Sequence, residues 1–160
     1  MTDSKSDDIL SLITADHREV DEYFVRLESA SEAEEVYEYL NRIYKELTLH
    51  AQAEESVFYP ALQKYEDAKN LVEEAKAEHS EMKVLLEDIQ AAKPNSNEFR
   101  DTLRQLKEAV RHHVEEEESD VFTMVRRHIS DQQLRALAQE FKTAKLQMVD
   151  EVEAAMVSSP

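Results

Sequence analysis

The sequence predicts an all-α protein, an antiparallel up-down-up-down four-helix bundle with a short fifth C-terminal helix. Its 160 residues contain no glycine and only three prolines, whereas sheet proteins use both residues at their turns. Apolar residues recur at alternating steps of three and four, which is the period of an amphipathic helix. We expect one domain over residues 9–157, preceded by a flexible polar tail at residues 1–8.

The apolar period divides the chain into five segments. They span residues 10–27, 36–61, 72–89, 99–124 and, in a shorter stretch without histidine, 134–152. Short connections make consecutive helices antiparallel neighbours, and we expect the fifth helix to close one end or flank of the bundle. Pro60 should kink or stop the second helix. The expected helix starts are a capping box of Ser31 with Glu34, N-caps at Asp67 and Asn95, and a capping box of Ser130 with Gln133.

Charge and composition exclude several classes of function. The net charge of −17 argues against nucleic acid and against an anionic membrane surface, since both require Lys and Arg. Cysteine is absent, so a metal would be held by nitrogen and oxygen alone. The first eight residues do not resemble a signal peptide, and no apolar run approaches the roughly 20 residues of a membrane span. We therefore expect a cytoplasmic protein.

The chain also contains an internal repeat. The step from His17 to His79 is 62 residues and the step from His50 to His113 is 63. His50 and His113 are each followed by adjacent glutamates at the fourth and fifth positions, which are residues 54 and 55 in the first copy and 117 and 118 in the second. Two copies of one helical unit would pair two equivalent half-sites at the centre of the bundle.

Polar residues interrupt the apolar stripes at equivalent levels. Residues four apart share a helix face, so His50 and Glu54 continue the stripe of their helix. Buried glutamates without a partner would cost several kcal/mol each, and a bound cation would remove that cost. We therefore expect a metal centre with one metal on His17 and His50 and another on His79 and His113. The candidate ligands are His17, His50, Glu54, His79, His113 and Glu117.

Other polar residues fit the centre less well. His112 lies about 100° around the helix from His113, and His128 follows the apolar run, so both are expected at the surface. Asp21, one turn after His17, is a weaker candidate ligand. The run of residues 115–118 reads as a solvated face apart from its inward member, Glu117. No tyrosine follows Glu54 by one turn, where Phe58 stands, so no proton shuttle is expected.

The spacing separates two designs of metal-binding bundle. A ferritin-like di-iron site needs a glutamate three residues before a histidine on two helices, and no histidine here has one. The order His17, His50-x-x-x-Glu54, His79, His113-x-x-x-Glu117 instead resembles the hemerythrin-like HHE cation-binding domain over residues 9–124. The stretch from His50 to Pro60 is similar to the signature of that family.

The resemblance implies two non-haem iron ions, bridged by the two glutamates and by an oxo or hydroxo group. It implies binding of O2, peroxide or nitric oxide for sensing or detoxification, with weak catalase-like or peroxidase-like turnover left open. Oxygen carriers of this family have a fifth histidine near the position of His79, but Ala75 and Lys83 stand one turn to either side. The alternatives are an iron-storage or iron-sensing module and a metal-free structural bundle. We expect a monomer or weak homodimer.

Overall fold

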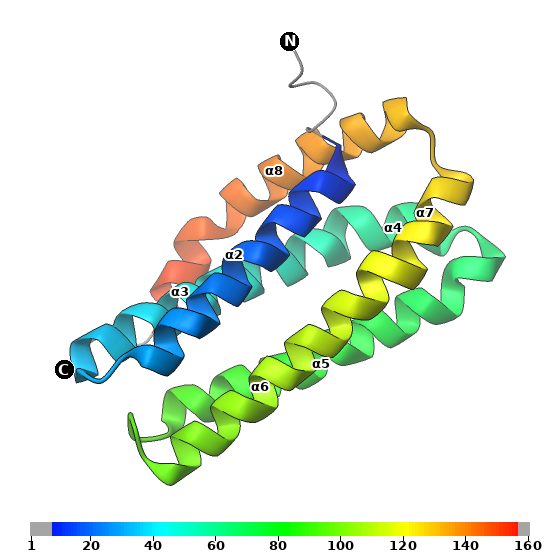
Figure 1. Ribbon diagram of the computed structural model, residues 1–160. Coiled ribbons are helices and arrows are strands. Elements are labelled where there is room, and N and C mark those ends of the chain that lie inside the picture. Colours follow the sequence, from blue (N-terminus) through cyan, green and yellow to red (C-terminus); the bar gives the residue numbers. More distant parts are fainter. Residues whose placement is uncertain (1–7, 157–160) are drawn as a thin grey trace.

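The computed structural model describes residues 8–156, and these residues form helices without a strand among them (Figure 1). The prediction of an all-α bundle is confirmed, whereas the up-down-up-down order stays a prediction. Residues 1–7 of the expected tail and the last residue of the expected domain, Val157, lie outside the described residues, whereas Asp8 caps the first helix and accepts a hydrogen bond from the Ser11 amide. The long helices are α2 (Ile9–Ser29), α3 (Ala33–Ala53), α5 (Lys69–Ala91), α6 (Asn97–Glu116) and α8 (Asp131–Ala154).

Two of the long helices continue through a wider turn into a short helix. After α3 come the π-helical segment η1 (Glu54–Phe58) and α4 (Tyr59–Gln63), and after α6 come η3 (Glu117–Val121) and α7 (Phe122–His128). A 3-10 turn, η2 (Glu66–Ala68), precedes α5. Pro60 therefore does not stop its helix, because the backbone changes to the five-residue turn before it and continues to Gln63.

The fifth helix is not short, and this expectation was wrong. With 24 residues, α8 is the longest helix of the described part of the chain. It packs along α2 and α3 and buries Leu134, Ala138 and Phe141 (Figure 1). The capping box expected at its start is present, since Ser130 and Gln133 exchange hydrogen bonds between side chain and backbone.

The other expected helix starts differ from the structure. Helix α3 begins after Glu32, whose side chain makes no capping bond, so no capping box forms with Ser31. Asp67 lies within η2 and does not cap α5. The N-cap of α6 is Ser96, which accepts a hydrogen bond from the Phe99 amide, while Asn95 adopts a positive φ of 64° in the turn before it. Several short polar residues compete at each such joint, and the sequence does not rank them.

The core consists of two apolar clusters with a polar layer between them. On α2, Ile13 belongs to one cluster and Val20 to the other, and His17 lies between these two residues. On α5, Ala75 and Met82 flank His79 in the same way. The two clusters therefore close the polar layer from both ends of the bundle. No helix in residues 8–156 has the length and apolarity needed to cross a membrane.

Candidate metal centre

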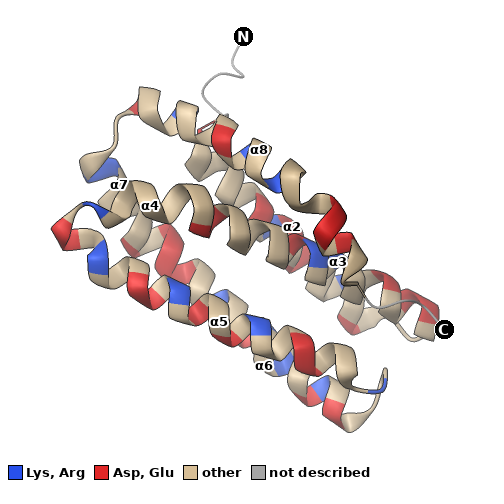
Figure 2. Cartoon of the chain, turned by 180° about the vertical axis from the view of Figure 1, so that it is seen from behind, with Lys and Arg blue, Asp and Glu red and all other residues tan. Residues whose placement is uncertain are grey.

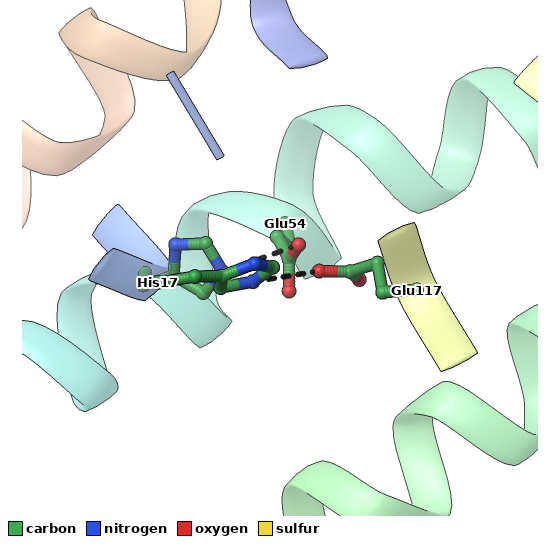
Figure 3. A group of neighbouring side chains, drawn as sticks. His17, Glu54 and Glu117 are labelled. Carbon is green, nitrogen blue, oxygen red and sulfur yellow. Dashed lines mark ion pairs between the residues drawn. The ribbon is translucent and has the colours of Figure 1, made fainter. Parts of the chain in front are cut away.

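The six residues expected as ligands converge in this polar layer. Each is at most 6% exposed. They come from α2, α3, η1, α5, α6 and η3, so every long helix except α8 supplies one histidine. Figure 3 shows His17, Glu54 and Glu117 pointing toward one another from three different elements. The structure thus brings together the set His17, His50, Glu54, His79, His113 and Glu117.

The donor atoms form two groups that share one carboxylate. One group contains His17, His50, Glu54 and Glu117, and the other contains Glu54, His79 and His113. Within each group the ligand atoms lie within 4.8 Å of one another. The Glu117 Oε1 atom is 3.1 Å from His17 Nε2, and its Oε2 atom is 3.5 Å from His113 Nε2. Both glutamates therefore lie between the two histidine pairs, as two half-sites require.

Each of the four imidazoles is held from outside by a carboxylate. The carboxylate oxygens lie 2.7–2.8 Å from the Nδ1 atoms, which is a short, charge-assisted distance. When Nδ1 carries the proton and donates it to the carboxylate, the lone pair of Nε2 faces the centre. The pairs are His17 with Glu118, His50 with Asp16, His79 with Glu55 and His113 with Glu78.

Sequence reasoning missed these four carboxylates. Interpreting residues 115–118 as a solvated face was wrong for Glu118, whose side chain is 23% exposed and reaches His17 across the bundle. A signal was present, because each of the four residues is adjacent in sequence to an expected ligand and recurs in the internal repeat. Asp16 and Glu78 are equivalent by this repeat, and so are Glu55 and Glu118. The repeat therefore covers the supporting carboxylates as well as the ligands.

The buried donor atoms fit a metal better than they fit one another. His17 Nε2, His50 Nε2, Glu54 Oε2 and Glu117 Oε1 are all buried and lack a hydrogen-bond partner. The distances of 3.1 Å and 3.2 Å that join them in pairs do not have hydrogen-bond geometry. Buried polar atoms are rarely left in this state, and a cation between them would satisfy all four. Imidazole nitrogen and carboxylate oxygen together are ligands for divalent transition metals.

Electrostatics couples the donors tightly. Burial by itself would lower the pKa of His50, but the Glu54 and Asp16 carboxylates raise it to about 10. Burial would raise the pKa of Glu54, yet the neighbouring histidines, His50 first, hold that pKa well below its ordinary value. Without a metal, His50 is thus stabilised in its protonated form beside Glu54, and a metal that binds His50 would have to displace this proton.

Helix α8 contributes to one side of the centre only. Lys145 Nζ donates to Asp16 Oδ2 at 2.8 Å and to Glu46 Oε1 at 3.1 Å, and Phe141 meets the His50 ring edge-on at 5.9 Å. Burial would raise the pKa of Asp16, but His50 and Lys145 lower it. This carboxylate is therefore fixed in its charged form between an imidazole and an ammonium group.

Tyr59 is a buried neighbour of the centre that the sequence analysis did not identify. Its hydroxyl donates to Glu117 Oε2 at 2.7 Å, and it lies 3.1 Å from Glu54 Oε1 and 3.3 Å from His79 Nε2. We expected no proton shuttle because Phe58 stands one turn after Glu54, but η1 brings the fifth residue, Tyr59, to the two carboxylates, while Phe58 is buried in an apolar cluster. Burial and the two carboxylates raise the pKa of Tyr59 well above its ordinary value, so the phenol keeps its proton.

A small cavity adjoins the four imidazoles on the other side of the centre. Its volume is about 20 Å³, enough for roughly one water-sized molecule. All four histidines line it, together with apolar side chains such as Val20, Leu47, Met82 and Val110. The cavity therefore has room for one small molecule beside the four rings.

The remaining polar candidates lie away from the centre. The His112 side chain is 64% exposed and meets Glu116 Oε2 at 3.1 Å, as expected for a surface residue. His128 pairs with Asp67 at 2.8 Å and stacks on a tyrosine ring. Asp21, the weaker candidate, pairs with Arg111 at the surface and does not join the six candidate ligands.

Two known proteins are similar to most of this chain, and their names differ in kind. A protein named DNA nickase from Nostoc sp. strain PCC 7120 is 40% identical over 144 residues, which are 90% of this chain but 41% of that protein. The chain thus spans about two fifths of the length of this relative. An uncharacterized hemerythrin-like protein of Schizosaccharomyces pombe is 30% identical over 139 residues, 86% of this chain and 68% of that protein.

The family comparison covers most of the helical bundle. Residues 8–125 match the family described as the hemerythrin HHE cation binding domain, and this range contains all six candidate ligands but not α8. No solved structure matches. By this match, and by the similarity to the yeast protein, the chain belongs to the hemerythrin HHE cation-binding domain family.

Proposed function

We propose that this chain is a non-haem di-iron protein that binds O2, peroxide or nitric oxide for sensing or detoxification, with weak catalase-like or peroxidase-like turnover. The observation that carries the proposal is the combination of two donor groups with a cavity of about 20 Å³ beside them. When bound, iron would supply open coordination positions and redox equivalents for such ligands. Membership of a cation-binding family supports the presence of a metal.

The protein side chains have separate tasks in this proposal. His17 and His50 would hold one metal, His79 and His113 the other, and the carboxylate of Glu54 is within reach of both groups. The carboxylates on the four Nδ1 atoms fix the ring orientations and make the imidazoles more basic. The apolar clusters above and below the polar layer exclude water from the centre.

Tyr59 is the candidate proton donor. Its hydroxyl is fully buried, holds its proton and lies among Glu54, Glu117 and His79. Reduction of peroxide to water consumes two protons, and disproportionation moves protons from one peroxide molecule to another, so a phenol within hydrogen-bond distance of both carboxylates is positioned to pass one on. Since its pKa is raised, transfer from this phenol is costly, which agrees with slow turnover.

Metal analysis with optical spectroscopy tests the proposal. The purified protein should contain two iron ions per chain, and its iron charge-transfer bands should change when peroxide or nitric oxide is added. A single zinc ion per chain would overturn the di-iron assignment. Iron whose spectrum does not change with these ligands would favour the alternative, an iron-storage or iron-sensing module.

We also propose that the protein is cytoplasmic and is a monomer or weak homodimer.

The name of the Nostoc relative makes DNA cleavage a second candidate function. Against it stands the net charge of −17, with acidic residues distributed over the helices (Figure 2). We propose that the chain shares its fold with the matching two fifths of that relative and does not bind nucleic acid. The test is to incubate the iron-loaded protein with supercoiled plasmid and to measure nicking. Catalase is added to remove peroxide, which would otherwise damage the DNA. Nicking that survives catalase and disappears in the variant His113→Ala would establish the second function instead.

A further inference from the structure

Two surface grooves approach the proposed centre, and the internal repeat relates one to the other. The first groove runs between α2 and α6, has a volume of about 390 Å³ and includes His17 in its lining. The second runs between α3 and α5, has a volume of about 410 Å³, includes His79 and is bordered by the end of α8. At corresponding positions the two grooves carry different residues: Arg18, Asp21 and Arg111 in the first and Ser80, Lys83 and Thr48 in the second.

Ion pairs join the two sides of the first groove. The Arg18 guanidinium donates to both oxygens of Glu118, at 2.8 Å and 3.1 Å, while the same carboxylate holds His17 Nδ1 at 2.7 Å. Arg111 donates to Asp21 at 3.3 Å, which joins α6 to α2. The carboxylate nearest the centre is therefore already neutralised, and two guanidinium groups line the approach to it. These groups balance the two carboxylates of the lining, Asp21 and Glu115, so the first groove carries no net charge that would attract cations.

The second groove lacks these ion pairs. The residues at the positions of the two arginines, Ser80 and Thr48, carry no charge. At its inner end Glu55 holds His79 Nδ1 at 2.7 Å, and its side chain is 44% exposed, against 23% for the equivalent Glu118. The charged residues lining this groove are Glu55, Glu87 and Glu151 against Lys83 alone. The second groove is therefore acidic from its mouth to the edge of the centre.

We propose that the groove between α3 and α5 is the route by which divalent metal ions reach and leave the centre. Carboxylates lining a cleft concentrate cations and raise their association rate by roughly 10- to 1,000-fold. Glu55 is the last carboxylate before the ring of His79, and its free surface lets it receive an ion from solvent. The groove between α2 and α6, whose lining charges cancel, does not attract cations in this way. This inference rests on the proposed metal centre.

The route is tested with Fe²⁺ under exclusion of oxygen. Metal-free protein is mixed with Fe²⁺, the stoichiometry is measured at equilibrium, and the rates of loading and of release to a chelator are measured separately. The variant Ser80→Arg places in the second groove the side chain that Arg18 supplies in the first. We expect it to slow both rates about 10-fold or more without changing the stoichiometry. The control Ala77→Arg adds the same charge at an exposed position of α5 outside the groove.

A second pair of variants keeps the test independent of how Ser80→Arg folds. Glu87→Gln with Glu151→Gln should slow loading at low ionic strength, and the difference should vanish at high salt because screening removes the attraction. Glu115→Gln, in the first groove, should not slow it. Equal loading rates in all of these variants would overturn the route and leave the metal centre intact. Wild-type protein that binds no iron would overturn both the centre and the route.

Discussion

The hydroxyl of Tyr59 should stabilise the metal-free protein, and replacing it by Phe measures how much. The hydroxyl donates to Glu117 Oε2 at 2.7 Å, in a site where both side chains are fully buried or nearly so. Tyr59→Phe keeps the ring and its packing but leaves this carboxylate with one hydrogen bond fewer. Apolar residues of the core pack around the phenol ring, so the variant keeps its surroundings and loses only the donor.

The size of the effect follows from the charge of the acceptor. A hydrogen bond to a charged, buried group contributes about 1.5–3 kcal/mol. For a domain of this size each kcal/mol shifts the melting temperature by roughly 2–4 °C, so a loss of about 2 kcal/mol lowers it by roughly 4–8 °C. The substitution should lower the free energy of unfolding, because a buried carboxylate without its donor is less stable than one with it.

Urea and thermal unfolding of the metal-free protein measure this loss. Tyr65→Phe is the matched control, since the Tyr65 hydroxyl reaches only the His128 carbonyl, at 3.5 Å, far from the centre. We expect a change below about 0.5 kcal/mol for the control. If Tyr59→Phe is no less stable than Tyr65→Phe, the phenol does not hold the carboxylates, and its assignment as proton donor loses its structural basis.

Three further predictions concern the centre. His113→Ala should remove one of two metal ions per chain, whereas His112→Ala, at an exposed neighbour, should leave the metal content unchanged. Asp16→Ala deletes the carboxylate on His50 and should weaken metal affinity about 10- to 100-fold in chelator competition, with Asp21→Ala as the unaffected control. Removing the metal should lower the melting temperature, since an ion at a thousand times its Kd adds about 4 kcal/mol to the folded state; equal melting temperatures would contradict a metal centre.

The sequence was informative where the helical period passes through the site without a break. His17 and His79 occupy positions at which their helices otherwise carry buried apolar residues, so the period alone placed both rings in the core. His113 and His112 are adjacent, yet only His113 keeps the period, and the structure buries it and exposes its neighbour. Position on a helix face is a local property, which a single sequence contains.

The supporting carboxylates and the fifth helix depend on contacts between helices. Glu118 looks like any solvated residue in an acidic run until α2 is placed beside it and brings His17 within 2.7 Å. The length of α8 was underestimated because its apolar stripe is sparse and covers only the outer side of α2 and α3. Lys145 on this helix reaches Asp16 across 129 residues of chain. The apolar period of a single helix does not predict such contacts between residues that are far apart in the sequence.

The wide turns at the two glutamates explain why the error about Tyr59 was systematic. In an α-helix the residue four after Glu54 would face the centre, but the five-residue turn brings Tyr59 there instead. The same turn follows Glu117, where the fifth residue is Phe122. Pro60 is not its common cause, because the other half has no proline at that position. The two copies of the turn thus differ at this position, because Tyr59 donates to the carboxylates of the centre, whereas Phe122 has no hydroxyl and packs in an apolar cluster.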